Sequence, residues 1–207
     1  MFADRLSEAA KRPVSRETSE RVEDFARLLV EENQRQNLIS RASEADLLDR
    51  HILDGAQLLR YDEREDARWI DIGTGPGLPG LVIALLHKGP VELIEPRPLR
   101  TAFLERMVTQ FELGDRVAVH QGKAAAVNMP GDVITARAVA SLTKFLDLSH
   151  HLSTEKTRWV LPKGRKALAE LEEAKRFWQA DFRVKKSLTD PDARIIIVER
   201  PKRKGRR

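Results

Sequence analysis

Glycines and a carboxylate give this chain its clearest chemical signal. Residues 69–80 read WIDIGTGPGLPG, an apolar run that leads into glycines at positions 73, 75, 77 and 80. Glycines in such a loop allow positive φ angles and let a ligand approach the bare backbone. Gly75, Gly77 and Gly80 also fit the G-x-G-x-x-G spacing of dinucleotide sites. The loop therefore predicts a nucleotide-like cofactor and leaves its identity open.

Two acidic residues narrow the choice of cofactor. Glu95 ends the next apolar run, where a carboxylate can accept hydrogen bonds from both ribose hydroxyls of an adenosine, whether in NAD or in S-adenosylmethionine. Asp71 precedes the first glycine by two residues. A pyrophosphate needs free backbone amides and no neighbouring anion, whereas a carboxylate suits the ammonium and sulfonium groups of S-adenosylmethionine. We therefore expect S-adenosylmethionine.

The alternative is an NAD-dependent oxidoreductase, which the glycine spacing and Glu95 also fit. The chain that follows Gly80 is too short for the second nucleotide-binding half of a dehydrogenase together with a substrate domain. Chain length therefore favours S-adenosylmethionine as well.

The elements that must position these residues alternate from residue 68 onward. The predicted strands are 68–72, 91–95, 116–120, 132–136 and 157–161, and the predicted helices are 78–87, 98–113, 141–150 and 164–179. Such alternation predicts a parallel sheet covered by helices on both faces. Ligands in this class bind outside the carboxyl ends of the strands, where the glycine loop and Glu95 would lie.

The last two predicted strands change the direction of the sheet. Runs 181–188 and 193–199 flank Thr189-Asp190-Pro191-Asp192, which predicts a hairpin turn. We therefore expect an α/β fold: a Rossmann-like, doubly wound, mostly parallel seven-stranded sheet that ends in an antiparallel hairpin.

The first third of the chain reads as a helical extension. Helical periodicity predicts a helix over 15–34, the polar run 33–40 predicts a loop, and Ser43-x-x-Asp46 predicts the start of a second helix that reaches residue 59. We expect residues 1–66 to pack on the same domain as the sheet, which would span 67–200, with a basic tail at 201–207.

Composition excludes several classes of protein. Within the 207 residues no apolar run approaches the ~20 residues of a membrane span, and the N-terminus lacks a secretory signal, so we expect a cytoplasmic protein with no membrane partner. The chain has no Cys, which excludes disulfides and thiolate metal sites. His150 and His151 are adjacent and cannot face one ion from a helix, so we expect no metal site. We also expect a monomer.

Charge points to an acidic partner without naming it. The formal net charge is +5, and the last seven residues, PKRKGRR, are mostly cationic. This segment is either a solvated tail or an arm that binds phosphates of a nucleic acid. An aromatic content of 5% argues against a surface built to stack single-stranded bases.

Several stretches together resemble a known family. Residues 71–80, DIGTGPGLPG, resemble the first motif of class I S-adenosylmethionine-dependent methyltransferases. The resemblance narrows to the bacterial 16S ribosomal RNA guanine-N7 methyltransferase G family, also called glucose-inhibited division protein B. The supporting stretches are NL at 37–38, RHILD at 50–54, TARAVASL at 135–142 and LPKG at 161–164. The resemblance implies S-adenosylmethionine as the methyl donor and 16S ribosomal RNA of the small ribosomal subunit as the partner.

The resemblance also implies which residues bind the cofactor. The candidates are Asp71, Gly73, Gly75, Gly77, Leu78, Glu95, Ala124, Ala125 and Arg137. The family carries an acidic residue near the adenine, where this chain has QGKAAA at 121–126. We therefore expect the backbone of Ala124 and Ala125, rather than a side chain, to meet the adenine edge.

Arg137 is the main candidate for positioning the acceptor, because it follows the fourth predicted strand. Its guanidinium can hydrogen bond to guanine O6, to the cofactor carboxylate or to a phosphate, and the sequence leaves these roles open. Lys163 and Arg194 are candidates for RNA phosphate contacts, and His51 for closing the pocket from the helical extension.

The residues also restrict the acceptor atom. Methylation of a pyrimidine C5 commonly uses a Cys nucleophile, and the chain has none. Methylation of adenine N6 is typically marked by Asn/Asp-Pro-Pro-aromatic, where this chain has Arg137-Ala138-Val139. Guanine N7 carries no proton, so its methylation needs alignment and no general base. A non-catalytic binder of ribosome precursors that uses the basic tail remains a third class of function.

Overall fold

The computed structural model describes residues 1–205, apart from the side chains of Ala42 and Ser43. The last two cations of the basic tail, Arg206 and Arg207, therefore lie outside the described residues. The predicted helix start at Ser43 is wrong, because Ser43 lies inside α3, which runs from Arg41 to Glu44 with Ser40 as its N-cap.

A single seven-stranded sheet forms the centre of the molecule, in the order β3-β2-β1-β4-β5-β7-β6. The strands are β1 (Trp69–Ile72), β2 (Val91–Glu95), β3 (Val117–Gln121), β4 (Val133–Thr135), β5 (Arg158–Lys163), β6 (Trp178–Lys186) and β7 (Arg194–Arg203). The first five strands run parallel. β7 is antiparallel to both β5 and β6. The predicted doubly wound sheet with its terminal hairpin is confirmed.

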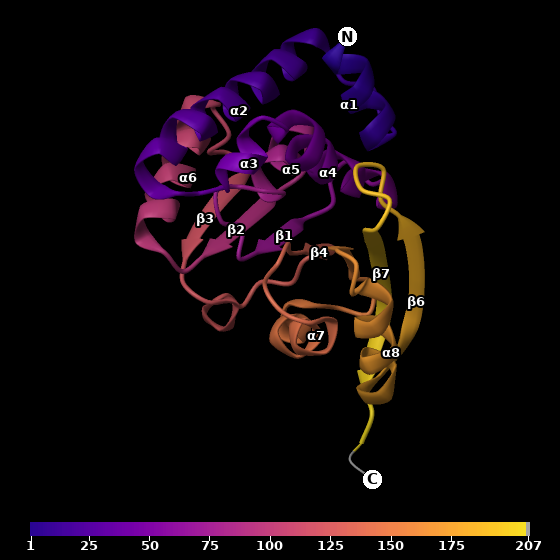
Figure 1. Ribbon diagram of the computed structural model, residues 1–207. Helices are drawn as coiled ribbons and strands as arrows, with labels where there is room; N and C mark the ends of the chain where they lie inside the picture. Colours follow the sequence, from indigo (N-terminus) through magenta and orange to yellow (C-terminus); the bar gives the residue numbers. More distant parts are fainter. Residues whose placement is uncertain (206–207) are drawn as a thin grey trace.

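Helices cover both faces of this sheet (Figure 1). On one face lie α1 (Phe2–Ala10), α2 (Arg16–Gln36), α3 (Arg41–Glu44), α4 (Leu53–Ala56), α5 (Gly80–Leu86) and α6 (Pro98–Gln110). On the other face lie α7 (Leu142–Ser149) and α8 (Ala167–Phe177). Short helical turns complete the chain: η1 (Leu48–Ile52), η2 (Gln57–Tyr61), η3 (Ala124–Ala126) and η4 (His150–Leu152). None of the described helices has the length and apolar character needed to cross a bilayer.

Strand alternation divides the core into two layers. In β7, Ile195 and Ile197 pack into the core on the α5 side, while Ile196 and Val198 pack into the core on the α7 side. Successive side chains of a strand point to opposite faces, so each strand buried on both faces supplies both layers. The parallel strands therefore read as continuous apolar runs.

The helical extension differs from its prediction in two places. α2 continues through Gln36, so the predicted loop at 33–36 is wrong. Asn33 and Gln36 stay helical because their side chains have partners: Asn33 Oδ1 accepts from the Ile39 amide at 2.8 Å, and Gln36 Nε2 donates to the Leu99 carbonyl at 3.1 Å. Asn37 ends α2 in the left-handed conformation at φ 51°.

The second predicted helix is instead a series of short turns. The π-helical turn η1 precedes α4 and the 3₁₀ turn η2, so the backbone changes its hydrogen-bond pattern between residues 48 and 61. Such π-helical turns often occur at functional sites. This series carries His51 toward the edge of the sheet.

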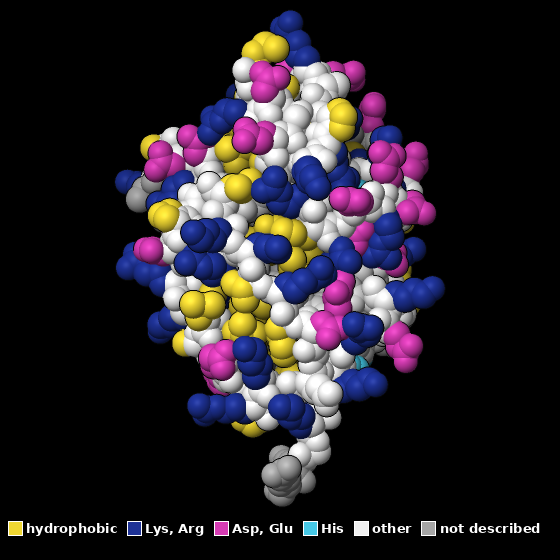
Figure 2. All heavy atoms as spheres, turned by 90° about the vertical axis from the view of Figure 1, so that its right-hand side faces the viewer, with side chains coloured by type: hydrophobic (Ala, Val, Ile, Leu, Met, Phe, Trp, Pro, Cys, Tyr) yellow, Lys and Arg dark blue, Asp and Glu magenta, His cyan; other side chains and the backbone are white. Residues whose placement is uncertain are grey.

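The basic C-terminal segment is largely part of the sheet. β7 extends to Arg203, which pairs with Trp178, whereas the sequence predicted a strand end at 199 and a tail from 201. The Arg203 guanidinium lies 5.3 Å from the Trp178 ring centroid and forms a 2.5 Å ion pair with Asp147. These contacts explain why a cationic stretch continues the strand. Figure 2 shows Lys and Arg side chains scattered over this side of the molecule, with Asp and Glu between them.

Candidate functional site

The glycine loop follows β1 and crosses the carboxyl ends of the parallel strands. Gly73, Gly75 and Gly77 have φ angles of 69°, 60° and 94°, which side-chain-bearing residues rarely adopt. A Cβ atom on Gly77 would lie 2.5 Å from Leu81 Cδ1, and one on Gly73 would lie 2.7 Å from Val139 Cγ2. At Gly75 the nearest atom, Arg100 Nη1, is 3.6 Å away. Close packing therefore requires two of these glycines, and Gly75 has the more open surroundings.

The amides of this loop all donate within the protein. Five of them donate to backbone carbonyls: Gly73 and Thr74 to Ile94, Gly77 and Leu78 to Thr74, and Leu81 to Gly77. The other two donate to carboxylates, Gly75 to Glu95 and Gly80 to Asp71. Positions 76 and 79 are prolines and have no N–H. A phosphate site at a helix start depends on free N–H groups. Residues 73–81 leave none for a pyrophosphate.

Asp71 occupies the place at the start of α5 where a phosphate would bind. The side chain is fully buried, and Oδ2 accepts from the Gly80 amide at 2.8 Å. Oδ1 makes no hydrogen bond of ordinary geometry with the described residues, although the Thr74 hydroxyl lies near enough to the carboxylate to affect its pKa. Burial raises the pKa of Asp71 to about 6, against the lowering effects of Thr74, the Gly80 amide and Arg137. A buried, unpaired carboxylate oxygen fits a cationic ligand group and repels a phosphate.

Glu95 joins the loop to the neighbouring strand. Its carboxylate accepts from the Gly75 amide and from the Arg97 amide, each at 3.0 Å. Its backbone carbonyl accepts from the Gly122 amide at 3.1 Å, which brings the end of β3 beside it. An ionised carboxylate offers about four acceptor positions, so two remain for hydroxyl donors such as those of a ribose.

Ala124 and Ala125 form the start of η3 near this edge. Ala124 is buried and its carbonyl accepts from His151 Nε2 at 3.1 Å, while Ala125 is exposed. The turn hydrogen bonds begin with the Ala126 amide, so the amides of Ala124 and Ala125 have no partner within the turn. Leu78 has a different place, because its side chain is buried in the core on the α5 side and its amide is used inside the loop.

Arg137 lies directly after β4 and reaches toward the helical extension. Its Nη1 donates to His51 Nδ1 at 2.6 Å. Burial, followed by the charges of Arg137 and Arg50, lowers the pKa of His51 to about 4. His51 is therefore neutral at physiological pH, with its proton on Nε2. Burial lowers the pKa of Arg137, and the charges of the Asp54 and Asp71 carboxylates act in the opposite direction.

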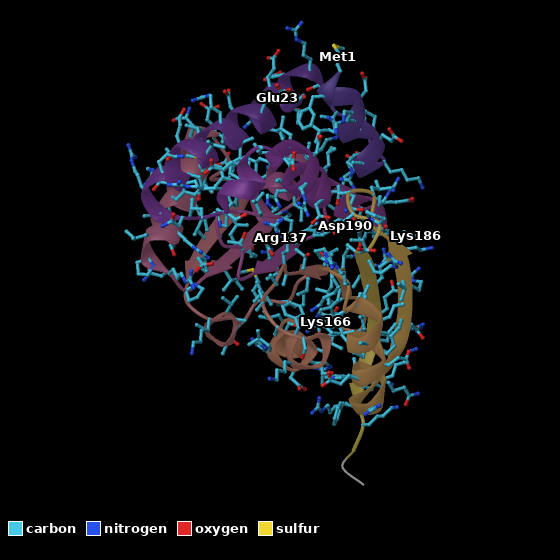
Figure 3. The ribbon with its side chains drawn as sticks, viewed as in Figure 1. Met1, Glu23, Arg137, Lys166, Lys186 and Asp190 are labelled. Carbon is cyan, nitrogen blue, oxygen red and sulfur yellow. The ribbon has the colours of Figure 1, made fainter. Side chains whose placement is uncertain are left out.

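A cavity of about 190 Å³ opens beside Arg137. Figure 3 shows Arg137 near the centre of the molecule and Asp190 in the loop between β6 and β7. The lining of the cavity includes Arg50, His51, Asp54, Arg137, Lys163, Thr189 and Asp190. Segments distant in sequence thus meet at one sheet edge, and two of the predicted RNA-binding residues, His51 and Lys163, lie beside Arg137.

The two residues predicted to bind RNA phosphates have intramolecular partners. Lys163 Nζ lies 2.9 Å from Glu170 Oε2 and donates to the Ala140 carbonyl at 2.6 Å. Arg194 does not line the cavity, and its Nη1 donates to the carbonyls of Pro191 and Ala193, each at 2.7 Å. A phosphate contact by Lys163 or Arg194 would compete with these bonds.

Sequence reasoning missed Asp54 and Thr189 as members of the site. Thr189 Oγ1 donates to Asp54 Oδ1 at 3.0 Å, which ties the β6–β7 loop to α4. Asp54 ends the RHILD stretch that carries part of the family resemblance, and that signal marks it. Nothing in the local pattern around Thr189 indicates a contact across 135 positions. Leaving out Ala42, Ser43 and the last two residues, no three His, Asp or Glu side chains are grouped as a metal site.

Comparison with known proteins decides the family. The family model described as GidB: rRNA small subunit methyltransferase G matches residues 18–198. The chain belongs to this family. Ribosomal RNA small subunit methyltransferase G of Sphingopyxis alaskensis is 43% identical over 190 residues, which cover 89% of this chain and 81% of that protein. The protein of the same name from Gluconobacter oxydans is 40% identical over 190 residues, 92% of this chain and 97% of that protein.

Solved structures of low sequence identity share the fold. A methyltransferase from Geobacter sulfurreducens has a TM-score of 0.60 at 12% identity and covers 85% of this chain and 88% of its own. M. jannaschii TYW2 in complex with AdoMet has a TM-score of 0.53 at 18% identity and covers 68% of this chain and 71% of its own. These likenesses confirm the Rossmann-like methyltransferase architecture.

Family membership makes the chain a methyltransferase that uses S-adenosylmethionine. The residues present fit this group. The unpaired Asp71 Oδ1 suits its ammonium, the remaining acceptor positions of Glu95 suit its ribose hydroxyls, and the free amides of η3 suit the acceptor nitrogens of its adenine.

Proposed function

We propose that this protein transfers a methyl group from S-adenosylmethionine to N7 of a guanine in 16S ribosomal RNA of the small ribosomal subunit. Family membership and the names of the relatives support the RNA class. The guanine and its N7 atom are the finer part of the proposal, drawn from the residues at the sheet edge. We also propose that the reaction takes place in the cytoplasm and that the protein acts as a monomer.

The main support for the proposed cofactor is that every loop amide already has an acceptor within the protein. With every N–H of residues 73–81 bonded inside the protein and Asp71 at the start of α5, the loop offers acceptors and negative charge. This arrangement favours a ligand with an ammonium and a sulfonium over a pyrophosphate. The NAD-dependent alternative is therefore disfavoured by the same glycine loop whose spacing suggested it.

Each candidate residue has a distinct task. Asp71 pairs with the amino group of the cofactor, Glu95 accepts from the ribose, and Ala124 and Ala125 meet the adenine edge. Arg137 holds the acceptor base, oriented by its hydrogen bond to His51. When bound, S-adenosylmethionine supplies an electrophilic methyl group on a positively charged sulfur.

The protein residues then need to hold the base and take up no proton. N7 of guanine has an outward lone pair and carries no proton, so alignment supplies most of the acceleration. His51 is neutral and its Nδ1 lone pair is used by Arg137. His51 therefore acts as a hydrogen-bond partner of Arg137 and not as a base, in keeping with a reaction that needs no proton abstraction.

Ligand-induced stabilisation tests the cofactor. S-adenosylhomocysteine at about 100 times its dissociation constant should stabilise the protein by about 2.7 kcal/mol, measured by thermal unfolding, while NAD at the same concentration leaves the transition unchanged. Stabilisation by NAD alone would overturn the proposal.

A further inference from the structure

Asp54 presents a carboxylate to the cavity beside Arg137, although methyl transfer to N7 needs none. It belongs to α4 and lines the cavity with Arg137, His51 and Asp190. The side chain is partly buried, and its hydrogen-bond partners within the protein use only one of its two oxygens. Asp54 is therefore placed to contact a bound ligand.

One oxygen of Asp54 is fixed and the other is available. Oδ1 accepts from Gln57 Nε2 at 2.7 Å and from Thr189 Oγ1 at 3.0 Å. Within the described part of the chain, no hydrogen bond reaches Oδ2. The two donors come from different segments, one from η2 and one from the β6–β7 loop, and together they fix the orientation of the carboxylate.

The lining of the cavity contains both hydrogen-bond donors and acceptors. Arg137 supplies N–H donors, and Asp54 and Asp190 supply carboxylate oxygens. Guanine has acceptors at O6 and N7 and a donor in its 2-amino group, whereas adenine has an amino donor in place of O6 and no 2-amino group. With O6 toward Arg137, the 2-amino edge of guanine matches a carboxylate.

The size of the cavity suits one base. About 190 Å³ is less than the ~300–1,000 Å³ usual for sites that enclose drug-sized ligands. A flat ring system fits this volume, while the ribose and phosphates of the same nucleotide would remain outside, near the exposed Arg50.

We propose that Asp54 is the residue that selects guanine, with its free Oδ2 accepting a hydrogen bond from the 2-amino group of the target base. This inference rests on the proposed function and adds the residue that determines its specificity. Gln57 and Thr189 act as positioning residues, because both hold Asp54 through Oδ1.

The test compares two RNAs that differ by one amino group. A small-subunit ribosomal RNA fragment that the wild-type protein methylates is prepared with guanosine or with inosine at the target position. Inosine keeps O6 and N7 and lacks the 2-amino group. The wild-type protein should methylate the inosine RNA about 10- to 100-fold more slowly, as expected when a hydrogen bond to a charged group is removed. Equal rates would overturn the inference and leave the proposed function standing, whereas failure to methylate the guanosine RNA would refute that function.

Asp54→Asn gives the decisive variant. The amide oxygen keeps the donors from Gln57 and Thr189, so its NH₂ takes the place of Oδ2 and faces the 2-amino group. The preference for guanosine should disappear or reverse. The comparison variant Thr189→Val removes one donor to Oδ1 but keeps the carboxylate, so it should lower the preference for guanosine less than Asp54→Asn does. If Asp54→Asn slows both equally, Asp54 has only a structural role. For a variant too slow to assay, RNA binding in the presence of S-adenosylhomocysteine gives the same comparison.

Discussion

Arg137 Nη1 donates a 2.6 Å hydrogen bond to His51 Nδ1. This bond joins the end of β4 to the π-helical turn η1, so the helical extension helps to orient a residue of the sheet edge. It also fixes the tautomer of His51, because Nδ1 can accept only when it carries no proton. The turn η1 of the helical extension is therefore part of the site.

Two replacements of Arg137 should distinguish the contribution of its charge to methyl transfer from that of its planar guanidinium. Arg137→Ala should lower the rate of methyl transfer by about 100-fold, the size of effect expected when an acceptor is misplaced by about 1 Å. Arg137→Lys keeps the charge and loses the planar fork that reaches His51, so we expect an intermediate rate. Single-turnover methyl transfer to small-subunit RNA measures both, with Arg16→Ala on the exposed face of α2 as control. A Lys variant as fast as wild type would show that charge alone suffices.

His51 should remain neutral throughout the working range of pH. Its folded pKa of about 4 lies below the ordinary 6.5, so its contribution to stability is present above pH 6.5 and is lost as the pH falls toward 4. The imidazole NMR resonances should include one that titrates near pH 4 and is absent in His51→Gln. A midpoint near 6.5 for that resonance would contradict the buried hydrogen bond to Arg137.

Asp71→Asn should stabilise the free protein and weaken cofactor binding. The folded pKa of about 6 lies above the ordinary 3.8, so stability linked to Asp71 is present below pH 3.8 and is lost as the pH rises through 6. Two pKa units correspond to at most about 3 kcal/mol. Urea unfolding should show a larger gain for the variant at pH 8 than at pH 5. Calorimetry should show weaker binding of S-adenosylhomocysteine, and unchanged affinity would exclude Asp71 from the cofactor site.

The basic end of the chain gives a prediction about salt. Truncation after Arg203 removes Lys204, Arg206 and Arg207 and keeps the pairing of Arg203 with Trp178. If these cations bind phosphates, the slope of log K against log salt for RNA binding should fall by about 0.7–0.9 for each phosphate that is no longer neutralised. Neutralising Arg16, Arg27 and Arg35 on α2 is the matched control for net charge. An unchanged slope after truncation would mean that the tail does not bind RNA.

The sheet could be predicted from the sequence because its strands are apolar on both faces. The predicted strand 91–95 coincides with β2. α1 escaped prediction because a nine-residue helix has little stability of its own, and packing of Leu6, Ala9 and Ala10 holds it. The loop prediction at 33–36 failed for a related reason, since tertiary hydrogen bonds of Asn33 and Gln36 override their local tendency.

Some residues of the candidate site could likewise be predicted from local sequence, whereas others depend on tertiary contacts. The places of Asp71 and Glu95 at the sheet edge could be predicted, because Asp71 is the penultimate residue of β1 and Glu95 the last of β2, while their contacts with the cofactor stay predictions. Lys163 has the predicted position, but its ion pair with Glu170 depends on the start of α8, which local patterns do not specify. Asp54 could be recognised as a site residue only from the three-dimensional structure, because its partner Thr189 lies 135 positions later in the chain.

Analysis of the methylated nucleoside tests the central claim most directly. Small ribosomal subunits from a strain that lacks this protein are incubated with the purified protein and S-adenosylmethionine labelled in its methyl group, and the 16S RNA is digested to nucleosides. We predict label in 7-methylguanosine, with none from Arg137→Ala in the same time. Label in another nucleoside, or no label while RNA binding is intact, would contradict methylation of guanine N7.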